Sequence, residues 1–302
     1  MLAFDLIKSL IVEFDKRGVV AITLSGGEPL LYPHIWELLS FVKDNTRLKV
    51  ALNTNGMLLN QQHIEMLKER NVTDIQISLD GEEETHEKIR GQKTYQRTIA
   101  GIKRCIDNGI RVRVGYTINA VNSRDIASAV SHSVQLGAAS IAFYRYVPTS
   151  IRDINRELDL VPRQLMEISS QLVNLNKEYS SDEFSIYFEP LSFFSFLIEE
   201  KLFDHTKCLA GAGQLNISPL GDVVLCSHYR VNSGNIYSDT IENIWKHQNN
   251  IGSQYRDVIP DECADCRYSS RCKGGCKGIA LAHYGNADRK DPGCFYHLCD
   301  SR

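Results

Sequence analysis

The N-terminal two thirds of the chain alternates between two patterns of hydrophobic positions. Apolar side chains first recur with a helical period until Gly18, at Leu6, Ile7, Leu10, Ile11 and Phe14. This period predicts an amphipathic helix with one buried face. Residues 19–24 follow as a nearly continuous apolar and β-branched run, Val-Val-Ala-Ile-Thr-Leu. Such a run is typical of a buried parallel strand.

The alternation continues along the chain and predicts a fold class. Further helices are expected at about 33–42, 61–69, 95–107 and 126–135, and further strands at 48–52, 74–79, 111–118 and 139–144. Strands that alternate with helices at this spacing form parallel βαβ units. We therefore expect an α/β fold whose strands form an open sheet or a barrel.

Polar and glycine residues gather where each predicted strand ends, which is where parallel α/β folds place their active sites. The segments are 25–29 (Ser-Gly-Gly-Glu-Pro), 53–56 (Asn-Thr-Asn-Gly), 78–81 (Ser-Leu-Asp-Gly), 117–119 (Thr-Ile-Asn) and Arg145. Gly26 and Gly27 let the backbone approach a ligand closely, and Glu28 supplies an acceptor for a cation. A plain βα turn, with Pro29 starting a helix, explains the first segment equally well.

Composition narrows the classes of function. A length of 302 residues, 43% hydrophobic, accommodates a barrel-sized core and a smaller appendage. The net charge of -3 gives no electrostatic basis for binding nucleic acid or an anionic membrane. Charged side chains from Asp5 to Asp15 interrupt the first apolar segment, which argues against a signal peptide or a membrane span there. We expect a cytoplasmic protein.

The cysteines divide the chain into two parts. Of nine cysteines, Cys105 alone lies in the first two thirds, and the others fall between Cys208 and Cys299. A reducing cytosol does not sustain structural disulfides, so clustered cysteines there indicate metal ligands. We expect a body at residues 1–200 and a cysteine-rich domain at 201–302.

The spacing of the tail cysteines is typical of metal-binding loops. The series is C-x12-G-x4-C at Cys208 and Cys226, then C-x2-C-x5-C-x3-C at Cys263, Cys266, Cys272 and Cys276, followed by Cys294. Turns at Gly274-Gly275 and Gly293 would bring the thiolates together. Seven thiolates exceed one tetrahedral zinc site and nearly fill two four-thiolate sites. A zinc ribbon is the alternative, although it has no place for the long first limb.

With these motifs, the sequence resembles the radical S-adenosylmethionine (SAM) superfamily, in its branch with a C-terminal SPASM domain that matures peptides and cofactors. The resemblance implies a partial (βα) TIM-like barrel of radical SAM type, followed by a small cysteine-rich α+β SPASM domain. Gly26, Gly27 and Glu28 resemble the family's GGE motif, which holds the amino group of SAM. Thr54, Ser78 and Asp80 lie in motifs similar to those that line the same cofactor.

Arg90 resembles the arginine that some SPASM enzymes use for the SAM carboxylate, since a guanidinium binds a carboxylate bidentately. A solvated arginine on a helix face explains its position equally well.

The resemblance also implies two auxiliary [4Fe–4S] clusters. Cys263, Cys266, Cys272 and Cys294 would hold the distal one. Cys208, Cys226 and Cys276 would hold the nearer one, whose fourth position is open; Cys299 is a candidate for it. The chain departs from the sulfatase-maturing branch at Gln214, where that branch has a cysteine, and at Ser227, where it has an aspartate.

One family motif does not occur in the sequence. The SAM-cleaving third cluster needs a C-x3-C-x2-C loop after a first barrel strand, and Cys105 is solitary on a predicted helix. Either the N-terminus is truncated and the first strand missing, or the chain is a degenerate member; the intact remaining motifs favour truncation. We expect this chain to bind SAM weakly without cleaving it.

The resemblance implies an enzyme whose full-length parent generates a 5′-deoxyadenosyl radical to modify a peptide or small-molecule precursor. Reduced ferredoxin or flavodoxin would donate the electron. The alternatives are a non-catalytic iron–sulfur scaffold for peptide binding or electron transfer, and a zinc-stabilised module. Tyr144, Tyr146, His228 and Tyr229 are candidates to face the substrate, with packing or surface exposure as the alternative. The sequence does not identify the substrate.

Overall fold

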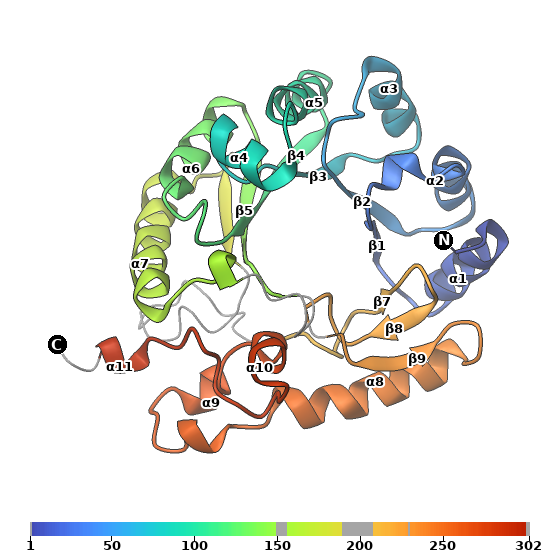
Figure 1. The fold of residues 1–302 in the computed structure, drawn as a ribbon. Helices are drawn as coiled ribbons and strands as arrows, with labels where there is room; N and C mark the ends of the chain where they lie inside the picture. The colour runs from blue at the N-terminus through green and yellow to red at the C-terminus, as the bar shows by residue number, and fades with distance from the viewer. Residues whose placement is uncertain (1, 149–155, 189–207, 229, 300–302) are drawn as a thin grey trace. The chain divides into compact units, whose positions relative to one another are not determined.

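The computed structural model describes residues 2–148, 156–188, 208–228 and 230–299 (Figure 1). The chain forms two compact units, one of residues 1–144 and 175–187 and the other of residues 145–174 and 188–302. The domain boundary predicted at residue 200 lies outside the described residues. In the described ranges, no helix has the length and the apolar character needed to cross a membrane.

The first unit is built on a six-stranded sheet whose strands are adjacent in chain order. The first four strands pair in parallel with a continuous register. The last strand was not predicted, because its four residues are too short a run to give a pattern. The strands are β1 (Ala21–Leu24), β2 (Lys49–Thr54), β3 (Asp74–Ser78), β4 (Arg111–Ile118), β5 (Ser140–Arg145) and β6 (Ser185–Phe188).

Helices follow the strands, as the pattern predicts, and α1, α2, α3, α5 and α6 lie along one side of the sheet (Figure 1). The helix predicted to begin at residue 33 starts later, because Pro29–Leu31 forms a separate 3-10 turn capped by the Glu28 side chain. Neither α4 nor α7 was predicted from the hydrophobic pattern. The helices are α1 (Phe4–Lys16), α2 (Ile35–Asn45), α3 (Gln61–Glu69), α4 (Glu83–Arg90), α5 (Tyr95–Asp107), α6 (Ile126–Gln135) and α7 (Pro162–Tyr179).

The core of this unit lies between the sheet and its helices. Ile22 and Leu24 of β1 pack against the buried side chains of Ile11 and Leu38. Along β1 the residues alternate between exposed and half-buried, so the predicted burial on both faces is wrong for this strand. β1 is at the edge of the sheet, with β2 as its partner among the described strands. Its apolar side chains Ile22 and Leu24 join the cluster formed with α1 and α2.

The second unit contains a three-stranded antiparallel sheet and several short helices. Thr240 caps α8, which packs on β9 at Gly234, where a side chain would overlap Ile244. The elements are β7 (Asn216–Ile217), β8 (Asp222–Val224), β9 (Asn232–Asn235), α8 (Ile241–Arg256), α9 (Ser269–Cys272), α10 (Lys277–Tyr284) and α11 (Tyr296–Cys299). Most of the tail cysteines lie in the turns that join these elements.

Candidate functional site

The carboxylate of Glu28 is held at the ends of two neighbouring strands. Its Oε1 accepts hydrogen bonds from the Thr54 hydroxyl at 2.7 Å and from Leu30 N at 3.2 Å, and its Oε2 accepts from Asn55 N at 2.9 Å. An ionised carboxylate offers about four acceptor positions. Three are occupied by these described donors, which leaves one position for an N–H of a ligand.

Gly26 and Gly27 border this carboxylate and face open space. Gly26 has φ +121°, a conformation that favours glycine, and a Cβ built at either glycine meets no atom within 4 Å. Both residues are exposed, whereas Thr54 is 3% exposed. The glycines therefore keep room beside a carboxylate that is already oriented. Of the predicted residues, the structure brings Gly26, Gly27, Glu28 and Thr54 together.

Asp80 and Arg90 form a second group at the ends of β3 and β4. Arg90 Nε donates to Asp80 Oδ2 at 2.6 Å, and Thr117 N donates to Asp80 Oδ1 at 2.7 Å. The Asp80 side chain is 1% exposed and that of Arg90 is 35% exposed. Arg90 therefore differs from a solvated surface arginine, because a buried carboxylate fixes one edge of its guanidinium. The terminal nitrogens carry further N–H donors suited to a carboxylate. Ser78 is half-buried at the end of β3.

Two further residues shape this edge and were not found from the sequence. His86 is 1% exposed, and its Nδ1 accepts a hydrogen bond from Asp80 N at 3.2 Å. Burial lowers the pKa of His86, although the Asp80 carboxylate acts in the opposite direction. Asn122 is fully buried and donates to the carbonyls of Asp80 and Thr117 at 3.2 and 2.9 Å. The paired asparagines Asn119 and Asn122 were the available signal.

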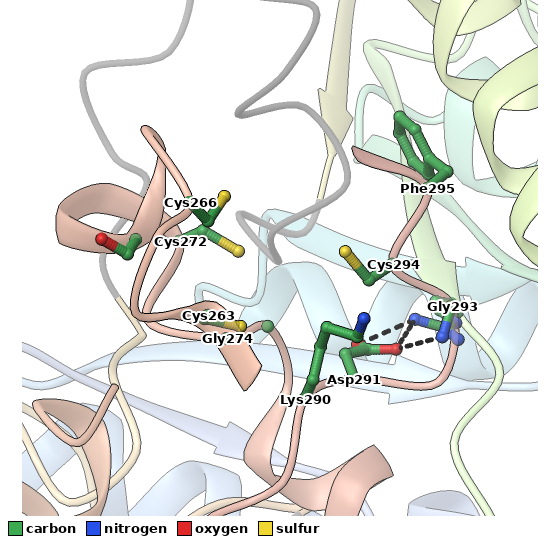
Figure 2. A pocket seen from close by; sticks show the side chains of 12 residues that line it. Cys263, Cys266, Cys272, Gly274, Lys290, Asp291, Gly293, Cys294 and Phe295 are labelled. Atoms are coloured by element: carbon green, nitrogen blue, oxygen red, sulfur yellow. Dashed lines mark hydrogen bonds and ion pairs between the residues drawn. The ribbon is translucent and has the colours of Figure 1, made fainter. Parts of the chain in front are cut away.

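Four of the tail cysteines line one pocket in the second unit, which we call the thiol pocket. They are the four predicted to hold the distal cluster, Cys263, Cys266, Cys272 and Cys294. Figure 2 shows the sulfur atoms of Cys272 and Cys294 directed toward each other from the two walls. Arg145, Lys290 and Asp291 also line the pocket. Four thiolates are the donor set of a [4Fe–4S] cluster, so these residues fit that group.

The thiols of this pocket interact with one another electrostatically. Burial, with smaller contributions from Cys294, Asp291 and Cys263, raises the pKa of Cys272 to about 12. Burial also raises the pKa of Cys263 and of Cys294, and Lys290 opposes both shifts. A cation or a cluster is needed to make these thiolates favourable together. Among the described residues, no three His, Cys, Asp or Glu side chains are grouped to hold a single metal ion.

The three cysteines predicted for the nearer cluster lie in two places. Cys208 and Cys226 pack on one apolar cluster with Leu225, whereas Cys276 packs with Val147 and Ile279.

Lys277, which was not singled out from the sequence, is a buried cation of the second unit. It is 5% exposed and its Nζ donates to the Val258 carbonyl at 2.9 Å. Burial lowers its pKa, and Asp288 and three cysteine thiols, including Cys208, oppose this.

Of the residues predicted to face a substrate, the Tyr144 hydroxyl donates to Gln76 Oε1 at 2.8 Å, in the first unit. Tyr146 and His228 are half-buried in the second unit, and burial lowers the pKa of His228. Tyr229 and the side chain of Cys299 lie outside the described residues.

Comparisons with known proteins agree on one family. The profile of the radical SAM superfamily matches residues 2–129, and that of an iron–sulfur cluster-binding domain, SPASM, matches residues 208–267. The chain is 30% identical to the AdoMet-dependent heme synthase of Methanosarcina barkeri, over 98% of this chain and 88% of that protein. It is 29% identical to the PqqA peptide cyclase of Gluconobacter oxydans, over 92% of this chain and 78% of that one.

Solved structures share the fold. Native anSMEcpe with bound AdoMet superposes with a TM-score of 0.79 at 18% identity, covering 99% of this chain and 86% of the other. The parallel sheet with its outer helices is accordingly the partial barrel of radical SAM proteins. The chain therefore belongs to the radical SAM superfamily, a family of enzymes that use SAM and [4Fe–4S] clusters, and it carries a SPASM domain.

Proposed function

We propose that the chain supplies the SAM-binding site and the auxiliary clusters of a radical SAM enzyme that modifies a peptide or a small-molecule precursor. The observation that carries the proposal is the Glu28 carboxylate, held by three hydrogen bonds beside two glycines that face open space. This arrangement suits the ammonium group of SAM, because the carboxylate is fixed before the ligand arrives. The family membership of the chain supports the same choice of ligand.

The other predicted residues complete the proposed SAM site. Glu28 binds the amino group, and Gly26 and Gly27 give access to the backbone. The guanidinium of Arg90, oriented by Asp80, binds the SAM carboxylate through its terminal nitrogens. Thr54 and Ser78 line the cofactor from the ends of β2 and β3. SAM supplies, on receiving an electron, a 5′-deoxyadenosyl radical that removes a hydrogen atom from the substrate.

The tail holds the auxiliary clusters in this proposal. Cys263, Cys266, Cys272 and Cys294 bind the distal cluster in the thiol pocket, and Cys208, Cys226 and Cys276 bind the nearer one. The positive charge of Lys290 in the pocket favours the thiolate form of Cys263 and Cys294. A reduced ferredoxin or flavodoxin is the proposed electron donor.

The substrate class rests on the relatives. One is named for heme synthesis and another for cyclisation of the PqqA peptide, at nearly equal identity to this chain. We therefore propose a substrate class that includes the substrates of both relatives, a peptide or a small-molecule cofactor precursor.

The proposal is tested by filling the space beside Glu28. A Cβ at Gly27 meets nothing within 4 Å, and its φ is not in the region reserved for glycine, so Gly27→Ala and Gly27→Val should fold normally. We expect SAM affinity, measured anaerobically by calorimetry, to fall stepwise from wild type to alanine to valine. Thermal unfolding of the same samples is the control for folding. Equal affinity in all three proteins, or no SAM binding by the wild type, would contradict the proposed site.

A further inference from the structure

A buried ion pair lies against the thiol pocket. Asp291 is 3% exposed and Arg145 is 7% exposed. Arg145 Nη1 donates to both carboxylate oxygens of Asp291, at 3.0 Å each. Little solvent reaches either group, so the two charges interact in a poorly hydrated environment.

Asp291 also binds two backbone segments that carry cysteines. Its Oδ2 accepts a hydrogen bond from Cys276 N at 3.1 Å, and its Oδ1 accepts from Gly293 N at 2.7 Å. Its own backbone N donates to the Gly274 carbonyl at 2.8 Å, and its carbonyl accepts from Cys294 N at 3.0 Å. One residue therefore connects the turn before Cys276 with the turn before Cys294.

Two glycines make room for the pair. Gly275 has φ +90°, and a Cβ there would overlap the Cβ of Asp291. A Cβ at Gly293 would overlap the Arg145 guanidinium. The ion pair therefore packs directly against the backbone of the two cysteine loops, at Gly275 and Gly293.

We propose that Asp291 and Arg145 are a positioning pair that fixes Cys276 and Cys294 relative to each other and sets the reduction potential of the cluster in the thiol pocket. This inference rests on the cluster ligands of the proposed function. Arg145 lines the same pocket as the four thiols, so its charge acts on them in a poorly solvated environment. The Arg145–Asp291 pair is neutral overall, and removal of either partner changes the net charge beside the cluster by one unit.

The test uses Asp291→Asn, Arg145→Met and the double variant, each isolated with its clusters. Reduction adds negative charge to a cluster. The potential should therefore rise in Asp291→Asn, which leaves the cation, and fall in Arg145→Met, which leaves the carboxylate. The double variant should return close to wild type. Potentials are measured by redox titration followed by electron paramagnetic resonance, with iron and sulfide determined in every sample.

Glu242→Gln is the matched control, because Glu242 lies on α8 in the same unit and forms a solvent-exposed pair with Lys246, at 55% and 68% exposure. Water screens this pair, so its loss should leave the potential nearly unchanged.

Shifts in the same direction in both single variants, or none, would overturn the inference, because a purely structural role predicts no opposed shifts. If the single variants lose iron, the double variant decides: wild-type iron content supports charge coupling, and loss of iron refutes it. A wild-type protein without iron and sulfide would instead refute the cluster ligands themselves, and the proposed cluster function with them.

Discussion

The strand-edge site around Glu28 and Asp80 and the thiol pocket are organised in different ways. At the strand edge, each polar side chain follows a parallel strand of fixed register, and hydrogen bonds to neighbouring strand ends orient it. In the thiol pocket, the cysteines come from short helices and turns, and a buried ion pair and glycines connect them. The first site is preorganised by secondary structure, whereas the second depends on contacts between distant loops.

This difference predicts different responses to the loss of a ligand. Regular parallel strands are stabilised by their own hydrogen bonds and by the apolar layer beneath them, so the strand edge should keep its shape without a cofactor. Cysteine loops with a small apolar core generally take part of their folding free energy from the metal. Variants of the two sites should therefore separate binding from folding.

The largest effect is expected in the thiol pocket. Cys272→Ala should reduce bound iron from about eight to about four atoms per chain, as expected for loss of one of two clusters. It should also make the second unit more sensitive to proteolysis. Iron and sulfide analysis of anaerobically reconstituted protein measures the first result. Cys105→Ala, which replaces a fully buried thiol on α5, is the control that should retain all iron. Full iron in Cys272→Ala would show that the ligands are misassigned.

A weaker effect, mainly on SAM binding, is expected at Glu28. Glu28→Gln keeps the shape of the side chain but removes the charge that attracts an ammonium group. A hydrogen bond to a charged group contributes about 1.5–3 kcal/mol, so the Kd for SAM should rise about 10- to 100-fold. Calorimetry measures the affinity, and Glu37→Gln, an exposed carboxylate on α2, serves as the control. A loss of fold rather than of affinity would remove the contrast between the two sites.

Asp80→Asn tests how far the strand edge depends on a buried charge. It should lower the free energy of unfolding by about 1–3 kcal/mol, because the amide NH2 replaces one of two carboxylate oxygens that each accept a hydrogen bond. Asp74→Asn is a matched control at the other end of β3: its pair with Arg111 is 3.8 Å long and both side chains are more than half exposed. That change should cost less than about 0.5 kcal/mol. Urea unfolding of both variants gives the comparison, and equal costs would argue against a role for burial.

The smallest effect is a pH dependence at His86. Burial lowers its pKa in the folded protein from the ordinary value of 6.5. The folded state therefore binds the proton less readily than the unfolded state. The contribution of His86 to the free energy of unfolding should therefore be constant above pH 6.5. It should fall as the pH drops below that value.

Measurement of unfolding midpoints from about pH 7.5 to about pH 5.5 tests this sign, since the window spans the ordinary histidine pKa. His132 and His228 have lowered pKa values too, so His86→Asn should reduce the slope without abolishing it. An unchanged slope in this variant would exclude His86 as a contributor.

The regular elements of the first unit were predictable because their signals are local. The bounds of α3, α5, α6 and β4 agree with the hydrophobic periods, since each of these elements buries one face against the next. The four residues of β6 give no such period, and α7 was not predicted. The start of α2 was misplaced because the Glu28 side chain caps a separate turn at Pro29–Leu31.

The site was predictable where residue type alone implies the chemistry. Cysteine spacing and the Gly-Gly-Glu segment can be recognised from local sequence, whereas contacts between residues that are far apart in sequence cannot. Arg145 and Asp291 are 146 positions apart, and no local sequence pattern around either residue predicts its partner. His86 was missed for a different reason, since a lone histidine on a polar helix does not reveal that it accepts a hydrogen bond from a strand end.

The hydrogen bonds of Asn122 make the opening of the strand edge measurable by amide hydrogen exchange. Its Oδ1 accepts a hydrogen bond from Asn119 N at 2.8 Å, while its amide group binds the carbonyls of Asp80 and Thr117. The Asn119 amide hydrogen is thus shielded by a side chain that also joins the ends of β3 and β4. It exchanges with solvent only when this junction opens. The exchange rate of this single amide therefore reports how often the junction between the ends of β3 and β4 opens.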